Sequence, residues 1–275
     1  MATLLFSLMP IWLLAIILGF VEGLTEFLPV SSTGHLLIAE HLLKIDPSSF
    51  LRSDMFNVVI QAGAVLAVIP LFKDRLKMLS RLHEPASQQF LAKIIVAFVI
   101  TGVGGFIMEK KHFKLPEEVQ PVAIALIVGG IVFIAVEALL RNKQLSEEIS
   151  WTVAITVGLA QLIAAGFPGA SRSGSTIILA MIVGAGRARA TEFSFLVSIP
   201  TMLAASGYKI FKTLHHPAID AIPTDWSSLI IASVVAIIVS FIAVKWLLRY
   251  VQTHTFIGFG IYRIIAGAAL LLFIR

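Results

Sequence analysis

The sequence predicts an all-α polytopic membrane protein with two inverted-topology repeats, each a re-entrant helix hairpin plus three transmembrane helices. Three observations predict this fold. The composition is 58% hydrophobic and only 13% charged, whereas a soluble domain carries about 25% charged residues. Several apolar stretches are long enough to cross a bilayer, and two related apolar regions are each interrupted by a polar cluster. We expect one membrane domain over residues 1–275, with the first repeat about 1–140 and the second about 141–275.

The composition also excludes some classes of function. The chain has no cysteine, which excludes disulfide scaffolds, thiolate chemistry and cysteine metal sites. Its net charge of +5 suits a membrane with anionic lipids or an anionic substrate. No run of basic residues alternates with aromatic ones, so we do not expect nucleic-acid binding.

Six stretches read as simple membrane spans. A helix needs about 20 apolar residues to cross the roughly 30 Å of hydrocarbon in a bilayer. The stretches that meet this length lie near residues 54–72, 90–108, 121–140, 191–211, 227–249 and 256–274.

Two longer apolar regions do not read as simple spans, because a polar cluster containing proline lies in the middle of each. They run from about 4 to 43 and from about 151 to 186. Proline ends a helix at or before the preceding residue, and a chain that breaks at membrane depth must be buried in protein or line a wet cavity. Each region is therefore predicted to be a hairpin that enters the membrane and turns back.

The two polar clusters resemble each other. The alignment pairs Gly19 with Gly158, Glu22 with Gln161 and Pro29 with Pro168, all at the same separation. After a one-residue insertion, 31–34 aligns with 171–174. Three apolar spans follow each cluster, and an odd number of spans inverts the second copy, as in known inverted-repeat architectures. The alternative is chance similarity between apolar segments rich in glycine, serine and proline.

Glu22 and Glu26 are four residues apart, so they share one face of a helix. Ionisable groups at membrane depth are unfavourable and usually functional, and two carboxylates this close should not both ionise without a cation between them. A divalent metal such as Mg²⁺ would satisfy both and could bridge to phosphate. The alternative is that both are ordinary acids at the water interface.

Ser31, Ser32, Thr33 and Gly34 lie just before an apolar run, at a predicted helix N-terminus. Free backbone N–H groups and the helix dipole favour an anion there, although simple capping by one hydroxyl is the alternative. His35 falls on the first turn of the same helix. It is a candidate general acid, nucleophile or phosphate donor, or else a structural, hydrogen-bonded histidine.

Arg172 lies in the corresponding place in the second hairpin, among Ser171, Ser173, Gly174 and Thr176. A guanidinium group matches phosphate in a bidentate fork, glycine lets the backbone approach a ligand closely, and the hydroxyls supply further donors. The alternative is an interfacial arginine that reaches toward lipid headgroups.

Charged residues near the span ends predict topology. Glu137 and Arg263 are interpreted as anchors or as an ion pair. With six spans and two re-entrant hairpins, both termini lie on one side. The loops on the other side carry slightly more Lys and Arg, so the positive-inside rule places the termini outside the cytoplasm.

These features converge on a phosphate or pyrophosphate held at membrane depth. Such a site can bind, move or hydrolyse its ligand, and its depth suggests a lipid-linked substrate. Two classes of function remain open: a phosphatase, in which arginine and metal stabilise a transferred phosphoryl group, and a secondary transporter or flippase of an anionic or lipid-phosphate substrate.

The strings EGLTEFLPVSSTGH at 22–35 and PGASRSGST at 168–176, followed by EFSFLVSIP at 192–200, closely resemble the bacterial undecaprenyl-pyrophosphate phosphatase family associated with bacitracin resistance. The resemblance extends through FNVVIQAGAVLAV at 56–68 to IYRIIAGA at 261–268. It implies hydrolysis of undecaprenyl pyrophosphate to undecaprenyl phosphate and phosphate, which recycles the lipid carrier for cell-wall synthesis. It also implies a multi-pass protein of the bacterial plasma membrane with an extracytoplasmic active site.

The resemblance implies a site whose residues come from both hairpins. The expected catalytic residues are Glu26, Ser32, His35 and Arg172, and the expected ligands of Mg²⁺ or Ca²⁺ are Glu22 and Glu26. The expected substrate-binding residues are Ser31, Thr33, Gly34, Ser171, Ser173, Gly174 and Thr176. The nucleophile is left open between Ser32, His35 and water. A lipid pyrophosphate and membrane lipids are the expected partners, and a homodimer is left open.

Overall fold

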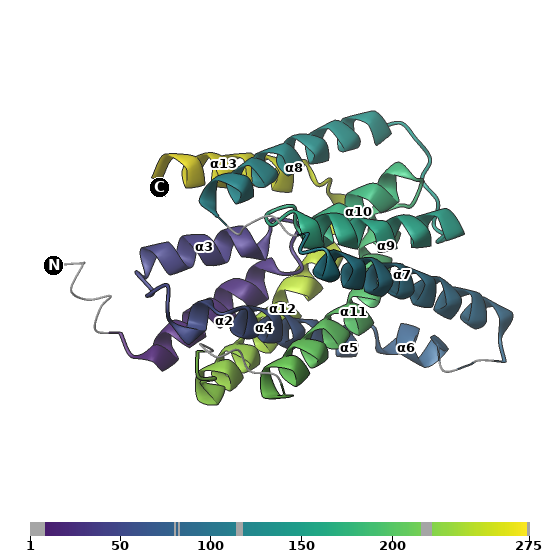
Figure 1. Cartoon of the computed structure of the whole chain (residues 1–275). Helices are drawn as coiled ribbons and strands as arrows, with labels where there is room; N and C mark the ends of the chain where they lie inside the picture. The colour runs from purple at the N-terminus through teal and green to yellow at the C-terminus, as the bar shows by residue number, and fades with distance from the viewer. Residues whose placement is uncertain (1–8, 80, 82, 114–117, 216–221, 274–275) are drawn as a thin grey trace.

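The computed structural model describes residues 9–79, 81, 83–113, 118–215 and 222–273, and these residues form helices without a named strand (Figure 1). The predicted all-α class is confirmed. The elements, in order, are α2 (Ile11–Thr25), α3 (Ser32–Leu42), η1 (Phe50–Arg52), α4 (Asp54–Leu66), α5 (Val68–Leu71), α6 (Lys73–Leu79), α7 (Pro85–Lys110), α8 (Val119–Leu140), α9 (Trp151–Gly166), α10 (Arg172–Ile182), α11 (Arg187–His215), α12 (Trp226–Thr253) and α13 (Ile257–Phe273).

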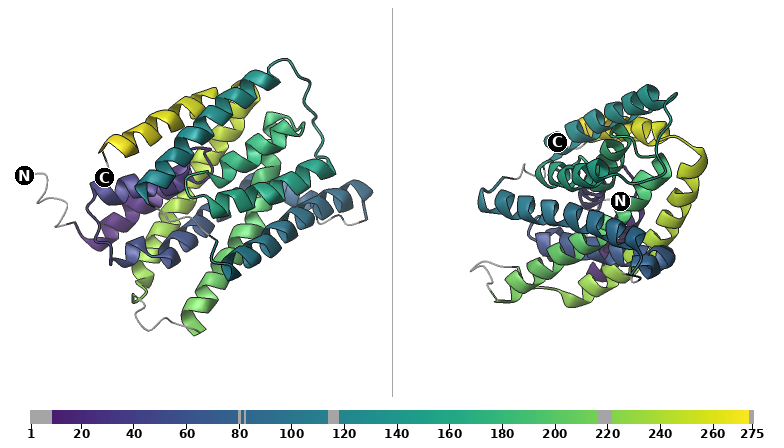
Figure 2. Two further views of the ribbon diagram at one scale, coloured as in Figure 1. Left: turned by 45° about the horizontal axis from the view of Figure 1, so that its top comes forward. Right: turned by 90° about the vertical axis from the view of Figure 1, so that its right-hand side faces the viewer.

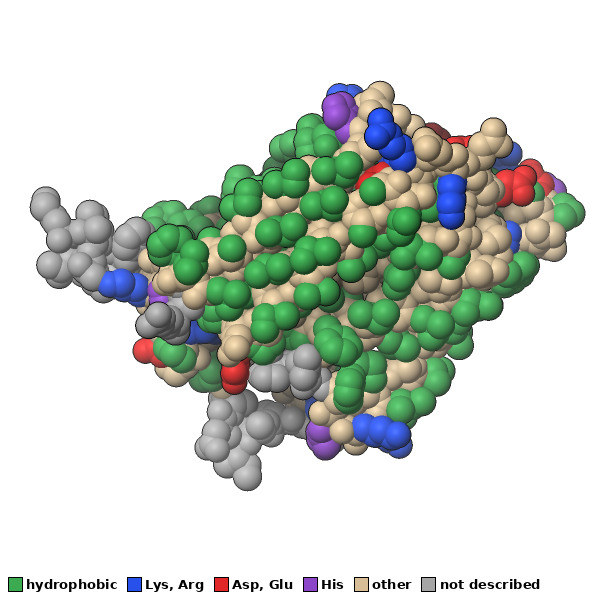
Figure 3. Space-filling model, turned by 90° about the horizontal axis from the view of Figure 1, so that it is seen from above, with side chains coloured by type: hydrophobic (Ala, Val, Ile, Leu, Met, Phe, Trp, Pro, Cys, Tyr) green, Lys and Arg blue, Asp and Glu red, His purple; other side chains and the backbone are tan. Residues whose placement is uncertain are grey.

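The helices have the length and surface of a membrane protein. Within the described residues, five helical segments are long and apolar enough to cross a bilayer: α4 together with α5, and α7, α8, α11 and α12. In α7 only 17% of the most apolar window is buried, so its apolar side chains face the solvent, which must be lipid. Figure 3 shows apolar side chains across the middle of one face and charged ones toward its edges.

The sixth predicted span is shorter than expected. It was predicted over 256–274, and α13 has 17 residues, below the length of a simple span. Residue 274 lies outside the described residues, as do residues 4–8 of the first predicted hairpin. The first predicted span is also not one straight helix. Pro70 removes the N–H that would bond to residue 66, and the chain breaks at Ala67 between α4 and α5.

Both predicted hairpins are present. α2 and α3 form the first, with a turn at residues 26–31, and α9 and α10 form the second, with a turn at residues 167–171. In each case the two helices pack against each other. The arms are too short to cross a bilayer on their own, so the polar turns lie inside the protein rather than at its surface.

The bases of the two hairpins lie at opposite ends of α11. The first hairpin leads into α4, whose Asp54 pairs with Lys209 near the end of α11 at 3.1 Å. Beside the base of the second, Ser146 exchanges backbone hydrogen bonds of 2.8 Å with Gly184 and Gly186, just before α11 begins. The hairpins therefore reach toward each other from the two ends of the molecule.

Helix contacts recur between the two halves of the chain. α2 packs against α12, α9 packs against α7, and α8 packs against α13, as the two views of Figure 2 also show for the last pair. A Cβ on Gly19 would collide with the backbone of Ala232, and one on Gly158 with the backbone of Ala97. Gly19 and Gly158 are the residues that the alignment pairs, and small residues let helix backbones approach closely in a membrane. The inverted relation of the two halves stays a prediction.

Glu137 does not pair with Arg263. Its carboxylate binds Arg187 at 2.5 Å between Oε2 and Nη2 and accepts the backbone N–H of Phe256 at 2.8 Å. The predicted ion pair is therefore wrong. Glu137 instead joins the end of α8 to the start of α11 and to the connection before α13, and Arg263 is left for a different role.

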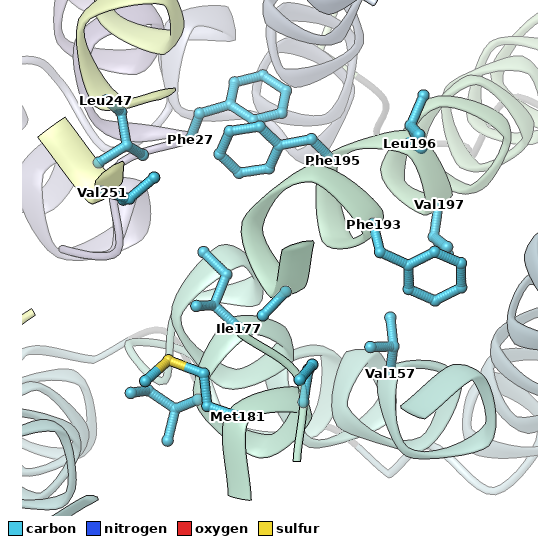
Figure 4. Packing of buried hydrophobic residues seen from close by; sticks show 14 of the residues in the cluster. Phe27, Val157, Ile177, Met181, Phe193, Phe195, Leu196, Val197, Leu247 and Val251 are labelled. Atoms are coloured by element: carbon cyan, nitrogen blue, oxygen red, sulfur yellow. The ribbon is translucent and has the colours of Figure 1, made fainter. Parts of the chain in front are cut away.

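The main apolar core packs directly against the turn of the first hairpin. Phe27 is fully buried and meets Phe195 of α11 edge to face, with ring centroids 4.8 Å apart (Figure 4). Leu247 and Val251 of α12 are buried in the same cluster. This packing fixes the position of the residue that follows Glu26, so the carboxylate is held by a rigid support.

Candidate active site

Two carboxyl groups project from the end of the first hairpin arm. Glu22 lies in α2, and Glu26 follows its last residue, with its backbone N–H donating to Glu22 O at 2.9 Å. Glu22 is 0% exposed and Glu26 is 7% exposed. Neither is an acid at the water interface, so the carboxylates belong to the interior that the two hairpins enclose.

Glu26 joins the two hairpins. Its Oε2 accepts the Ser32 hydroxyl at 2.7 Å, and its Oε1 accepts Nη2 and Nε of Arg172 at 2.9 and 3.3 Å. The guanidinium also lies over the Phe27 ring, 5.4 Å from its centroid. Residues predicted from two distant segments therefore meet at one carboxylate.

Arg172 keeps one end free for a ligand. Its side chain is 12% exposed, and Nη1 is buried without a hydrogen-bond partner among the described residues. A buried N–H group without a partner is unfavourable. An anion such as a phosphate oxygen would satisfy it and match the guanidinium fork.

The helix N-termini on the two sides of the site differ. At α10 the Ser171 hydroxyl accepts the N–H of Gly174 at 3.1 Å, which is a side-chain cap. At α3 the Ser31 side chain makes no such cap. The first N–H groups of α3 therefore remain available to an anion, and the capping alternative does not apply to that helix.

Both N-cap serines have an unusual backbone. Ser31 has φ 72° and Ser171 has φ 68°, a region that side-chain-bearing residues rarely adopt. The alignment pairs these two serines. Strained residues of this kind often mark functional sites, and here each one turns the chain from the hairpin loop into the helix that carries a site residue.

The remaining hydroxyls of the second hairpin mainly hold structure. Ser173 donates to the carbonyl oxygens of Leu28 and Glu26 at 3.1 and 3.3 Å, which ties the second hairpin to the first. Thr176 donates to the carbonyl of Arg172 at 2.8 Å. Ser173 and Thr176 therefore support the residues beside the site.

Three other predicted substrate-binding residues lie near the turns. Thr33 is half-buried on the first turn of α3. Gly34 faces α8, where an added Cβ would lie 2.9 Å from Leu126 Cδ1. Gly174 lies where an added Cβ would be 3.1 Å from Nη1 of Arg263. The two glycines provide room for helix packing.

His35 has no free ring nitrogen. Nδ1 lies 2.8 Å from the carbonyl oxygen of Ser31, and Nε2 lies 2.6 Å from the Tyr262 hydroxyl, whose ring stacks on the imidazole. Since a carbonyl only accepts, Nδ1 donates to it and Nε2 accepts from the tyrosine. This is the geometry of a structural histidine that fixes the carbonyl of Ser31.

Arg263 is a buried residue that the sequence did not identify as part of the site. It is fully buried on α13 and donates to backbone carbonyls in the turns of both hairpins. The sequence-based interpretation treated it as a residue near a span end, whereas it lies inside α13. The signal that could have revealed it is an arginine surrounded by apolar and small residues, IYRIIAGA, far from any acid in the same span.

The carboxylate pair is the best place for a metal. Both oxygens of Glu22 are buried and have no hydrogen-bond partner within the described part of the chain. Among the residues that the structure describes, no group of three or more His, Asp and Glu side chains could hold an ion. The protein would thus offer two carboxylates, and other ligands would come from substrate or water.

The chain matches the family model described as "Bacitracin resistance protein BacA" over residues 15–269. A protein of Rhizobium etli (strain CIAT 652) named undecaprenyl-diphosphatase is 52% identical over 259 residues, 94% of this chain and 95% of that protein. Proteins of the same name from Rhizobium leguminosarum bv. trifolii (strain WSM2304) and Xylella fastidiosa (strain 9a5c) are 53% identical over 260 residues and 47% identical over 259 residues. These matches cover 94% of this chain and 95% and 96% of those proteins.

Proposed function

The chain belongs to the bacitracin resistance protein BacA family, and from this premise we propose that it is an integral membrane phosphatase that hydrolyses undecaprenyl diphosphate to undecaprenyl phosphate and phosphate. The product is the lipid carrier of cell-wall synthesis, so the reaction recycles that carrier. The observation that carries the proposal is the Glu26 carboxylate, which holds a hydroxyl from one hairpin and a guanidinium from the other.

Substrate binding uses the N–H groups that have no hydrogen-bond partner among the described residues. The terminal phosphate binds Nη1 of Arg172 and the uncapped N-terminus of α3. The dipole of that helix and the guanidinium both favour the anion. Because the hairpin turns lie at membrane depth, the prenyl chain stays in the bilayer while its diphosphate reaches the site.

The geometry favours Ser32 as the nucleophile. Its hydroxyl already donates to Glu26 at 2.7 Å, the arrangement of a nucleophile beside its base. The Ser32 oxygen attacks the terminal phosphorus, its proton passes to Glu26 and from there to the bridging oxygen, and the bond between that oxygen and the terminal phosphorus breaks so that undecaprenyl phosphate leaves. Water, deprotonated by Glu26, then attacks the phosphoserine. Phosphate is released, and the serine oxygen takes back a proton.

Arg172 stabilises the charge that develops on the phosphoryl oxygens. Its pairing with Glu26 orients both groups before substrate arrives. His35 acts through the carbonyl of Ser31 and holds the turn, because both of its nitrogens are already engaged. Direct attack by water, with Ser32 orienting Glu26, is the competing route and differs in forming no covalent intermediate.

Glu22 and Glu26 suit a divalent metal. Mg²⁺ and Ca²⁺ prefer oxygen ligands, and Mg²⁺ is often bound by only one or two carboxylates together with substrate phosphates and water. The guanidinium of Arg172 pairs with Glu26, and both oxygens of Glu22 are left without a hydrogen-bond partner among the described residues. A bound metal would supply charge neutralisation for the phosphoryl oxygens, and Glu22 and Glu26 would hold it.

We assign the protein to the bacterial plasma membrane, with the active site open to the extracytoplasmic side. The multi-pass character rests on the five long apolar helical segments of the described residues and on the family. The charge bias of the loops supports only the placement of the termini outside the cytoplasm, and the extracytoplasmic opening of the site rests on the resemblance to the family. Labelling of single cysteines in intact cells tests it, since the chain has no natural cysteine.

Phosphate release from undecaprenyl diphosphate by the purified protein in detergent, with Mg²⁺ or Ca²⁺, tests the function. We expect steady release by the wild type and none by Glu26→Ala, which retains its monodisperse elution and helical content. Movement of the lipid across the bilayer of proteoliposomes without hydrolysis would instead support the transporter or flippase alternative. No contact among the described site residues specifically favours that alternative.

A further inference from the structure

Arg263 is a buried cation that binds no acid among the residues that the structure describes. It is 0% exposed, and within the described residues it donates its hydrogen bonds to backbone carbonyls. The acceptors are Pro29, Ala125, Leu126, Gly169 and Ala170, at 3.1 to 3.4 Å. A buried charge without a counter-charge is strongly unfavourable, so its five carbonyl partners must offset a large desolvation penalty.

Two of the carbonyls that Arg263 binds lie at the same distance along the chain from the N-cap serines of the two hairpins. Nη1 donates to Pro29 O at 3.2 Å, two residues before Ser31. Nη2 donates to Gly169 O at 3.1 Å, two residues before Ser171. These are the two serines with positive φ. One planar guanidinium group therefore binds a carbonyl in each turn, two residues before the serine with positive φ.

The surroundings of Arg263 are shaped to hold it in place. The guanidinium lies over the Phe133 ring, 5.4 Å from its centroid. On α8, Gly129 lies so close that a Cβ there would collide with Nη2 and Cζ of Arg263. Gly129 therefore leaves the space through which the side chain reaches both turns.

The hydrogen bonds of Arg263 fix the position of the two turns relative to each other. Ser32 lies three residues after Pro29, and Arg172 lies three residues after Gly169. Since Nη1 and Nη2 belong to one rigid plane, the two carbonyls cannot shift independently. The meeting of Ser32 and Arg172 at Glu26 depends on this register.

We propose that Arg263 is a positioning residue that locks the two hairpin turns in register and thereby assembles the active site at Glu26. The prediction for catalysis rests on the proposed phosphatase function. The prediction for the relative placement of the hairpins does not, so the two can fail separately.

Gly129→Ala tests the proposal without removing the cation. The added methyl group displaces the flexible end of Arg263 and leaves α13 unchanged. We expect kcat to fall by about 100-fold, the effect of a misplacement near 1 Å, with little change in KM. Gly105→Ala is the matched control, because an added Cβ there has no neighbour within 4 Å, and it should keep wild-type kcat and KM.

Arg263→Lys is the second variant. A lysine keeps the charge but has three donors on one nitrogen and cannot span both turns. We expect the same loss of kcat as in Gly129→Ala. Arg187→Lys is its control, since Arg187 pairs with Glu137 away from the hairpin turns, and its kcat should stay near the wild-type value in the folded fraction.

A distance measurement gives a readout independent of activity. Spin labels at Leu24→Cys on α2 and Ile163→Cys on α9 use two exposed positions, one on each hairpin, in a chain without natural cysteine. We expect a single narrow distance distribution in the wild type and in Gly105→Ala. In Gly129→Ala and Arg263→Lys the distribution should broaden or shift.

The outcomes separate the two claims. Wild-type kcat and unchanged distances in Gly129→Ala and Arg263→Lys would overturn the positioning role. A loss of kcat with unchanged distances would also overturn it, because Arg263 would then act by another route. If the wild type releases no phosphate but the distances shift as expected, the positioning role is supported and the proposed phosphatase function is what fails.

Discussion

Nη2 of Arg172 lies 2.9 Å from Oε1 of Glu26, although 146 residues separate them in the chain. The contact exists because the two hairpins, whose bases lie at opposite ends of α11, bring their turns together. Each hairpin supplies what the other lacks. The alignment pairs Glu22 with Gln161 and Ser32 with Arg172, so the acids come from one half and the guanidinium from the other.

Arg172→Lys should lower kcat/KM by about 100- to 1000-fold, the usual effect of losing one donor to a developing oxyanion. Lysine keeps the charge but cannot bind Glu26 and phosphate through separate fork positions. The measurement is steady-state phosphate release. Arg52→Lys is the control, because Arg52 of η1 pairs at 3.0 Å with Glu40, which lies at the end of α3 that is remote from the hairpin turn. Equal rates in the two variants would contradict the role of Arg172.

Ser32→Ala should remove a covalent intermediate as well as activity. Acid quenching of the wild type with labelled diphosphate is expected to trap phosphoserine, and Ser32→Ala should trap none and lose about 1000-fold or more in kcat. Ser48→Ala, an exposed hydroxyl bound to Asp46, is the control. Phosphohistidine trapped by an alkaline quench would shift the assignment to His35, and full activity in Ser32→Ala without a trapped intermediate would shift it to water.

Glu22→Gln should abolish the response to metal. Anything that binds only the folded state raises its melting temperature, so Mg²⁺ or Ca²⁺ should raise that of the wild type in detergent. Glu22→Gln replaces one carboxylate oxygen, and neither oxygen has a hydrogen-bond partner among the described residues, so the metal should no longer change the melting temperature of the variant. An equal shift in both proteins would place the metal elsewhere.

Asp225 should make stability depend on pH. Hydrogen bonds from Ser227 and Ser228 at the start of α12 lower the pKa of Asp225 below its usual value. The pKa of an aspartate in the unfolded chain is about 3.9. Because the pKa in the folded state is lower, the ionised carboxylate stabilises the fold above that pH, and the stabilisation is lost as the pH falls through the folded-state pKa. At neutral pH, Asp225→Ala should lose about 1 kcal/mol of unfolding free energy, the usual value of a cap.

The control for that prediction is Asp225→Asn. Asparagine caps helices about as well as aspartate, so it should keep most of the stability at neutral pH and lose the pH dependence. The measurement is the free energy of unfolding of the protein in detergent micelles, at pH 7 and at acid pH. If the unfolding free energies of Asp225→Ala and the wild type differ by the same amount at both pH values, the charge of the carboxylate does not contribute.

The sequence predicted the parts of the fold that depend on local chemistry. Proline and glycine predicted the positions of both hairpin turns. Glu22 and Glu26 are buried, and Glu26 pairs with Arg172 of the other hairpin. Apolar length predicted the long helices, although Pro70 breaks the first span into two helices.

Most other contacts between residues far apart in the chain could not be predicted from the sequence. Arg263 lies inside the last predicted span, and only the folded chain shows that both hairpin turns converge on it. The pairing of Glu137 with Arg187 depends in the same way on how α8 meets α11. The engagement of His35 with Tyr262 could not be predicted, because 227 residues separate them.

A double-mutant cycle on Glu26 and Arg172 tests the central claim most directly. Phosphate release from undecaprenyl diphosphate is measured for Glu26→Ala, Arg172→Ala and the double variant, each checked for monodisperse elution. Groups that act as one unit have strongly non-additive effects, so we predict that each single change lowers kcat nearly as much as both together. Additive losses, or normal turnover in either single variant, would contradict a single active site assembled from the two hairpins.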